Sequence, residues 1–196
     1  MSGSSVNSAK AWLTIGLFVP LCVINLLLIK QNLDLRKQLA AGARTLDLTN
    51  NVLKPGDVVS AVTATDLDGL PYQLNYNRDG RHRLLLFFSA SCPYCQQQSP
   101  LWRDLLDKVD TNRFTVVGVV SDREDKQLVS EHVNGAGYFK TNTPLPVLFF
   151  DDESLGTYKL TATPTTLLIN EEGRVEHAWV GKWDERSATE VAAALK

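Results

Sequence analysis

One long hydrophobic run and several short ones set the organisation of this chain. The long run covers residues 11–29, a stretch of 19 residues with no charged side chain. That length is just enough for a helix to cross the hydrocarbon core of a bilayer. The short runs are rich in Leu, Val, Phe and Thr, and polar segments with Gly, Pro, Asn and Asp separate them, as is typical of strands and turns. The pattern predicts an apolar N-terminal helix followed by a domain with several strands.

The domain is expected at residues 53–196, where predicted strands alternate with predicted helices. Such alternation predicts an α/β fold, a central mixed sheet flanked by helices. The predicted elements, in chain order, are a hairpin of Val58–Ala64 and Tyr72–Tyr76, a buried strand at Leu84–Phe88, a helix with Leu101, Leu105, Leu106 and Val109 on its apolar face, a strand at Phe114–Val120, a helix starting at Ser121–Asp122, a strand at Val147–Phe150, a short helix or turn at Asp151–Tyr158, a hairpin of Thr165–Ile169 and Arg174–Val180, and a final helix at Asp184–Leu195 with Asp184 as its N-cap.

Cys92 and Cys95 lie where the strand at Leu84–Phe88 is followed by a helix. Pro93 suits the first helical position, because an N–H there has no intrahelical partner. Cys92 then lies at or near the N-cap, where free backbone N–H groups and the helix dipole favour a thiolate. Cys95 lies one turn later on the same face, close enough for a disulfide. The pair indicates redox chemistry, with Cys92 the exposed nucleophile and Cys95 the buried resolving thiol; half of a zinc site and an inert scaffold are the alternatives.

The overall composition argues against several other classes of function. The chain has 196 residues, a formal net charge of −2 and 44% hydrophobic residues. It has no cluster of Lys and Arg, so no nucleic-acid partner is expected. The third cysteine, Cys22, is far from the pair, and no second Cys or Cys/His pair completes a zinc site. We therefore expect neither a metal nor another cofactor.

The segment before the domain divides into a polar tail (1–10), an apolar anchor (11–29) and a polar stalk or linker (30–52). We expect an uncleaved single-pass signal-anchor helix in the cell membrane. The alternatives are a signal peptide cleaved near residues 41–43, a lipoprotein modified at Cys22 and an ordinary core helix. Basic residues after the apolar run favour a cytoplasmic domain, whereas a tethered dithiol is most useful away from cytosolic reductants. We follow the chemistry and expect the domain to be extracytoplasmic, in the periplasm.

Three segments together carry a resemblance to a known family. They are the strand and dithiol at residues 87–95, the Thr-Pro-Thr-Thr strand and hairpin at residues 163–173, and the helix–strand insertion at residues 121–160. With the N-terminal hairpin, the order of these segments resembles membrane-anchored thioredoxin-like thiol–disulfide oxidoreductases of the ResA/TlpA type, within the redoxin family. The resemblance covers about residues 53–196, and the anchor is consistent with it.

The resemblance implies a fold, an activity and a site. The fold is thioredoxin-like, with an N-terminal β-hairpin and a helix–strand insertion. The enzyme exchanges thiols and disulfides through a mixed disulfide, with Cys92 and Cys95 catalytic and able to form the Cys92–Cys95 disulfide. Its partners are protein substrates with thiols or disulfides, for example apocytochrome c in cytochrome c biogenesis, and a membrane or soluble thiol electron donor. Reduction of exported proteins is the expected direction. The residues implied in substrate binding are Pro93, Tyr94, Thr163 and Pro164, the last as a cis-proline facing Cys92.

The sequence also departs from related families. Thioredoxins carry a buried acid six residues before the first cysteine, where this chain has Leu86, so another group or water must take the proton of Cys95. Glu153 is a candidate, but we prefer to interpret it as a surface acid. Ser91 stands where the family commonly has tryptophan. Cys-Pro-Tyr-Cys is also the glutaredoxin dipeptide motif, but glutaredoxins lack the hairpin, insertion and anchor. A peroxiredoxin site is disfavoured, since Leu85 stands where its proline should precede the cysteine.

Two further functions stay open at this point. Thiolates suit Cu(I), so the Cys92/Cys95 pair could belong to an extracytoplasmic copper-delivery module. Related metallochaperones use a wider cysteine spacing with a partner His or Met, and this chain has only Met1. The other alternative is a non-catalytic, partner-binding thioredoxin-like scaffold.

Overall fold

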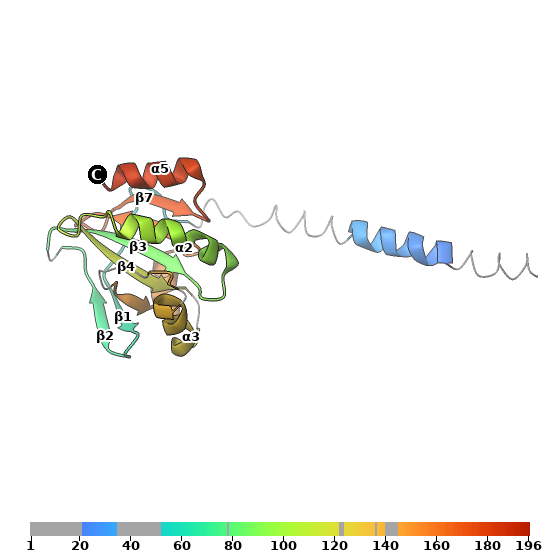
Figure 1. Ribbon diagram of the computed structural model, residues 1–196, viewed down its shortest axis with the longest axis horizontal. Coiled ribbons are helices and arrows are strands. Elements are labelled where there is room, and N and C mark those ends of the chain that lie inside the picture. The colour runs from blue at the N-terminus through green and yellow to red at the C-terminus, as the bar shows by residue number, and fades with distance from the viewer. Residues whose placement is uncertain (1–20, 35–51, 78, 122–123, 136, 140–144) are drawn as a thin grey trace, which may run out of the picture. The chain divides into compact units, whose positions relative to one another are not determined.

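A computed structural model of the chain describes residues 21–34, 52–77, 79–121, 124–135, 137–139 and 145–196 (Figure 1). The chain divides into two compact units, Met1–Asp47 and Leu48–Lys196. Some expectations lie outside the described residues: the polar tail (1–10), the first part of the anchor (11–20) and most of the stalk (35–51).

The second unit is built on a seven-stranded sheet in the order β2-β1-β5-β4-β3-β6-β7. The strands β3, β4 and β5 run parallel to one another, whereas β6 is antiparallel to β3 and β1 is antiparallel to β5, so the sheet is mixed as predicted. The strands are β1 (Val62–Asp66), β2 (Pro71–Leu74), β3 (His82–Phe88), β4 (Phe114–Val120), β5 (Val147–Phe149), β6 (Thr165–Ile169) and β7 (Val175–Val180).

Strand β3 supplies side chains to a hydrophobic core on each face of the sheet. Successive side chains of a strand point to opposite faces. Accordingly Leu84, Leu86 and Phe88 belong to the first core, and Leu85 and Phe87 belong to the second. Burial on both faces explains why this strand is a continuous apolar run in the sequence.

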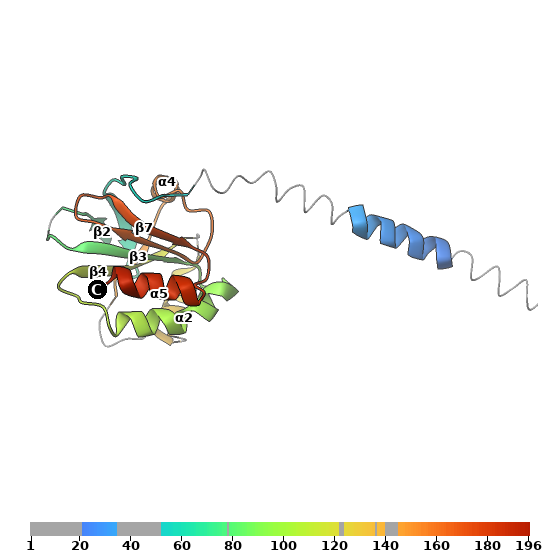
Figure 2. The ribbon, with the colours of Figure 1, turned by 90° about the horizontal axis from the view of Figure 1, so that it is seen from above.

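Helices cover both faces of the sheet, as predicted. Figure 2 shows α2 and α5 on one face and α4 on the other. The side chains of Asp125, Asp151 and Asp184 accept backbone N–H groups at the starts of α3, α4 and α5, which confirms Asp184 as an N-cap. The helices are α2 (Pro93–Leu106), α3 (Lys126–Ser130), α4 (Asp152–Thr157) and α5 (Glu185–Ala194), and a π-helical turn η1 (Glu131–Gly135) continues α3.

Three details of the predicted elements were wrong. The helix expected to start at Ser121–Asp122 begins at Lys126, because the side chain that accepts its first free N–H groups is that of Asp125. The first strand begins at Val62 rather than Val58. The two residues at the predicted start pair elsewhere, with the turn between β6 and β7: the N–H of Val59 bonds to the carbonyl of Gly173, and Val58 forms an isolated bridge with Arg174. Leu101 is 38% exposed and does not belong to the buried face of its helix. The buried face of α2 contains Leu106, as predicted, together with Cys95, Gln98, Ser99 and Trp102.

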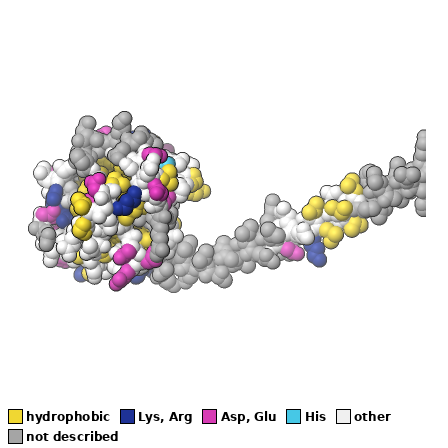
Figure 3. Space-filling view, turned by 90° about the horizontal axis from the view of Figure 1, so that it is seen from below, with side chains coloured by type: hydrophobic (Ala, Val, Ile, Leu, Met, Phe, Trp, Pro, Cys, Tyr) yellow, Lys and Arg dark blue, Asp and Glu magenta, His cyan; other side chains and the backbone are white. Residues whose placement is uncertain are grey.

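A helix at residues 21–34 belongs to the first unit, and all of its described residues are exposed. Hydrophobic side chains cover much of its surface (Figure 3). Among the residues that the structure describes, no helix is both long enough and apolar enough to cross a membrane. The predicted anchor at residues 11–29 begins outside this described helix, so the anchor stays a prediction.

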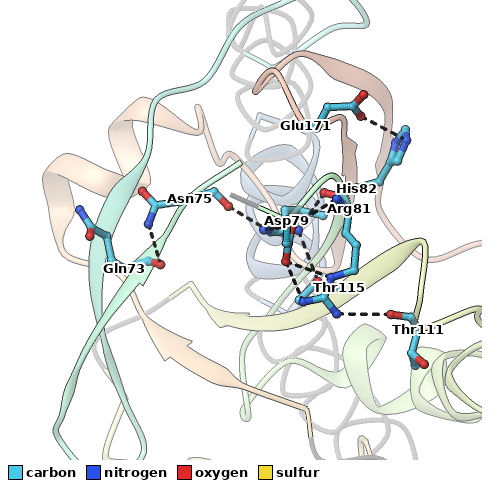
Figure 4. A network of polar contacts seen from close by, with 9 residues as sticks. Gln73, Asn75, Asp79, Arg81, His82, Thr111, Thr115 and Glu171 are labelled. Carbon is cyan, nitrogen blue, oxygen red and sulfur yellow. Dashed lines mark hydrogen bonds and ion pairs between the residues drawn. The ribbon is translucent and has the colours of Figure 1, made fainter. Parts of the chain in front are cut away.

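A network of arginines holds the start of β3, at the end of the strand opposite the dithiol loop (Figure 4). Arg83 is almost fully buried; its guanidinium donates to Asp79 Oδ1 at 2.9 Å and to the carbonyls of Asn75 and Arg81 at 3.1 and 2.8 Å. Arg81 donates to Asp79 Oδ2 at 2.7 Å and to the carbonyl of Thr111 at 3.3 Å. Desolvation opposes ionisation of Asp79, but the hydrogen bonds from Arg83 and Arg81 outweigh it and lower the pKa of Asp79 to about 2. The network ties the polar loop before β3 to the end of β2.

Candidate active site

The dithiol lies at the junction of β3 and α2, as the sequence predicted. Strand β3 ends at Phe88, and α2 begins at Pro93 with Cys92 as its N-cap in an extended conformation. The N–H of Cys92 bonds to the carbonyl of Ser89 at 3.2 Å, which closes the turn between the two elements. Cys92 is half-buried and Cys95 is fully buried, and both are free thiols, so the structure describes the dithiol form.

The surroundings of Cys92 favour its thiolate. The Cys92 side chain makes no capping hydrogen bond to α2. Its Sγ donates to the carbonyl of Thr163 at 3.5 Å. Partial burial opposes ionisation, but hydrogen bonds with the side chains of Thr163 and Cys95 and with the backbone N–H groups of Cys95 and Tyr94 lower the pKa of Cys92 below its ordinary value. Those two N–H groups belong to the free first turn of α2, so the helix start acts on Cys92 as predicted.

Cys95 has the opposite character. Burial raises the pKa of the Cys95 thiol to about 12, and its hydrogen bond and charge repulsion with Cys92 raise the pKa as well. The backbone of Ser89 lowers it only in part. The pair is therefore asymmetric, with one accessible thiol that ionises readily and one buried thiol that does not.

A cis-proline loop lies against Cys92. The peptide bond between Thr163 and Pro164 is cis, as the resemblance implied. The carbonyl of Pro164 accepts the N–H of Gly181 at 2.8 Å, which ties this loop to the end of β7. The contact between Cys92 and the Thr163 carbonyl brings together two residues 71 positions apart in the chain.

The remaining predicted residues lie at the surface beside Cys92. Pro93 occupies the first turn of α2, and the side chain of Tyr94 is 58% exposed. Val180, next to the cis-proline loop through Gly181, is also exposed. A partner that reaches Cys92 therefore meets the exposed side chains of Pro93 and Tyr94 at the start of α2, whereas Pro164 is buried.

Glu153 is a surface acid, as preferred from the sequence, and does not serve Cys95. It is exposed on α4, whose Leu155 packs in the second core, whereas Cys95 belongs to the first core on the other face of the sheet. Leu86 is fully buried, and thus the site has no acid at the position where thioredoxins carry one. Among the described residues, no group of three His, Cys, Asp or Glu side chains is placed to hold a metal ion.

Two polar residues that the sequence did not single out lie close to the dithiol. Glu124 accepts hydrogen bonds from the loop before Cys92, and the hydroxyl of Tyr138 donates to the carbonyl of Ala90 at 3.2 Å. Burial and the nearby Cys95 and Cys92 raise the pKa of Tyr138 above its ordinary value. Glu124 follows the strand next to β3, which is the one signal that could have identified it.

Comparison with known proteins agrees with this geometry. The sequence profile described as AhpC/TSA family matches residues 55–178. A curated relative, sporulation thiol-disulfide oxidoreductase A of Bacillus subtilis (strain 168), is 26% identical over 104 residues, which make up 52% of this chain and 61% of the relative. The match thus spans less than two thirds of the relative's length.

Solved structures share the fold at low sequence identity. A putative thiol:disulfide interchange protein DsbE from Chlorobium tepidum matches with a TM-score of 0.58 and 22% identity, over 74% of this chain and 99% of that chain. StoA from Bacillus subtilis matches with a TM-score of 0.54 and 19% identity, over 69% of this chain and 98% of that chain. These matches support the expected thioredoxin-like α/β fold.

Leu85 stands where a peroxiredoxin site has proline, so the residues around Cys92 differ from such a site although the profile matches residues 55–178. The family and the curated relative support an oxidoreductase enzyme. Because the profile covers more than half of the chain, the protein belongs to the AhpC/TSA family.

Proposed function

We propose that the protein is a membrane-anchored thiol–disulfide oxidoreductase that reduces disulfides of exported proteins. The observation that carries the proposal is the asymmetric dithiol: Cys92, accessible and with a lowered pKa, at a helix start against the cis peptide of Pro164, and Cys95 buried behind it. A small Cys-x-x-Cys loop adds little stability, so such an arrangement serves exchange rather than folding.

Reduction of a substrate disulfide proceeds in two steps. The Cys92 thiolate attacks one sulfur of the substrate disulfide, which forms a mixed disulfide and releases the other substrate sulfur as a thiolate. Cys95 then loses its proton and attacks the Cys92 sulfur. The second substrate thiol leaves, the Cys92–Cys95 disulfide remains, and two electrons have passed to the substrate.

The first step itself prepares Cys95 for the second. In the dithiol form, the hydrogen bond and the charge of Cys92 both raise the pKa of Cys95. Once Cys92 is part of a mixed disulfide it carries no charge, so both effects disappear and the pKa of Cys95 falls. Burial, the largest cause of the raised pKa, remains, so Cys95 ionises more readily once substrate is bound but still needs water or another group to take its proton.

The substrate is proposed to bind as an extended segment beside the cis-proline. The backbone of Thr163 precedes β6, next to Cys92, where it offers hydrogen bonds to an added strand. The exposed side chains of Pro93 and Tyr94 supply the apolar surroundings, and the buried Pro164 holds the backbone of Thr163 beside Cys92. Exported proteins, for example apocytochrome c, are proposed as substrates because the relatives are named for thiol–disulfide exchange and residues 11–29 form an uncharged, apolar run in the sequence.

A trapping experiment tests the mechanism and the substrate class together. In Cys95→Ser the mixed disulfide at Cys92 cannot be resolved, so full-length protein expressed in cells should accumulate adducts that mass spectrometry identifies as exported, cysteine-containing proteins. Cys92→Ser is the matched control and should trap none. Equal trapping by both variants, or adducts made only of cytosolic proteins, contradicts the proposal.

The anchor and its orientation need a separate test. Full-length protein should stay in the membrane fraction during alkaline carbonate extraction, because an apolar helix in the bilayer is not removed by salt or base. A C-terminal reporter that is active only outside the cytosol should be active. Release by carbonate, or an inactive reporter, rules out the anchored, extracytoplasmic arrangement.

A further inference from the structure

The three residues before Cys92 all bond to one side chain from another element. Glu124 Oε2 accepts the N–H of Ala90 at 2.7 Å, and Oε1 accepts the N–H of Ser91 at 3.1 Å. The hydroxyls of Ser89 and Ser91 donate to the same Oε1 at 2.9 and 3.0 Å. One carboxylate thus receives four hydrogen bonds from the loop that delivers Cys92 to the start of α2.

The topology explains how Glu124 reaches this loop. Strands β3 and β4 are parallel neighbours in which Phe88 pairs with Val120, so both strands end at the same edge of the sheet. Ser121 donates its N–H and its hydroxyl to the carbonyl of Phe88 at 2.9 and 3.1 Å, which joins the two strand ends. Glu124, three residues further along, therefore lies over the loop that follows β3.

The loop is held from a second side as well. Ala90 is buried, its N–H bonds to Glu124, and its carbonyl accepts the hydroxyl of Tyr138. The N–H and the carbonyl of Ala90 are thus both bound by side chains of residues that follow β4 in the chain. A buried peptide group held at both ends has little freedom to shift Cys92.

The carboxylate of Glu124 is charged at neutral pH. Partial burial opposes ionisation, but hydrogen bonds from the backbone of Ala90 and Ser91 and from the side chains of Ser89 and Ser91 lower its pKa below the ordinary value. A negative charge therefore lies beside the dithiol loop in both redox forms.

We propose that Glu124 is a positioning residue for the dithiol: its carboxylate holds the Ser89–Ser91 backbone that places Cys92 at the N-cap, and its charge opposes the Cys92 thiolate. Like charges raise a neighbour's pKa, and a less stable thiolate makes the reduced form less stable. Glu124 thus lowers the reduction potential of the dithiol, which makes the protein a stronger reductant. The inference rests on the proposed function and adds the residue that tunes it.

The test uses full-length protein in detergent with three variants. Glu124→Gln removes the charge but keeps an oxygen that accepts N–H groups, and Glu124→Ala removes both charge and hydrogen bonds. Glu153→Gln, an exposed acid on α4, is the matched control for loss of one charge. Three quantities are measured: the pKa of Cys92 from the ultraviolet absorbance of the thiolate, the equilibrium with glutathione, and the rate of mixed-disulfide formation per thiolate.

Glu124→Gln should lower the pKa of Cys92 and shift the glutathione equilibrium toward the dithiol on the order of tenfold, which corresponds to about 30 mV more oxidising. Glu124→Ala should in addition slow the rate per thiolate at least roughly fivefold, since Cys92 is no longer held for attack. Glu153→Gln should match the wild type in all three measurements.

The inference is overturned if Glu124→Gln has the Cys92 pKa and glutathione equilibrium of the wild type, even when its melting temperature differs. An unchanged rate per thiolate in Glu124→Ala also overturns it. Failure of the proposed function looks different: the wild type itself then forms no Cys92–Cys95 disulfide at any ratio of oxidised to reduced glutathione.

Discussion

Alkylation should separate the two cysteines of the dithiol in reduced protein. At pH 7, a thiol whose pKa is about 12 has about 10³-fold less thiolate than one at the ordinary value of 9.0. The thiolate of the weaker acid is the better nucleophile, by about 20-fold for three pKa units at a Brønsted coefficient of about 0.4. Cys92, whose pKa is lowered, should therefore react at least about 50-fold faster than Cys95, before the full burial of Cys95 slows it further.

The measurement is a quenched time course with iodoacetamide, with modification of each cysteine followed by fragment-ion mass spectrometry. A Cys22→Ser background leaves only the dithiol to react. The same protein in guanidinium is the control, since both cysteines should then react within a few-fold of each other. If Cys95 reacts within fivefold of Cys92 in the folded protein, the asymmetry argued from burial and the helix start is wrong.

Three further predictions concern the domain that carries the site. Asp79→Asn should lower the free energy of unfolding by about 1–2 kcal/mol at pH 7, because buried Arg83 loses a charged partner. The folded-state pKa of Asp79 is about 2 against an ordinary 3.8, so this difference is present above about pH 4 and disappears as the pH falls toward 2, which urea unfolding at several pH values measures. Trp102→Ala should lower the free energy of unfolding by about 3–5 kcal/mol in the same assay, because it leaves a cavity in the first core. Trp102→Phe should recover most of that loss, since the indole N–H has no hydrogen-bond partner among the described residues. Gly173→Ala should destabilise more than Gly80→Ala: both glycines have positive φ, but only at Gly173 does a Cβ come within 2.7 Å of a backbone oxygen, so equal losses would contradict the close approach.

The dithiol and its local geometry could be predicted because they depend on neighbouring residues. A short apolar run, a proline at the first helical position and two cysteines one turn apart determine where Cys92 lies relative to the helix. The hairpins and the N-cap at Asp184 were predicted for the same reason, since turn and capping signals act over a few residues. The cis form of Pro164 came from the resemblance and not from any local pattern.

The sequence alone determined which chemistry the chain carries and where its strands and helices lie, whereas the tertiary structure decided what surrounds the thiols. Glu124 and Tyr138 lie 34 and 48 residues after Ala90 in the loop they hold, and no local pattern marks them. They meet that loop because β3 and β4 are parallel neighbours whose ends lie at one edge of the sheet. Likewise, Glu153 is a suitable acid in the sequence but lies on α4, which packs on the second core. Hydrogen bonds between distant segments depend on strand order and helix placement, and those depend on the packing of the whole domain.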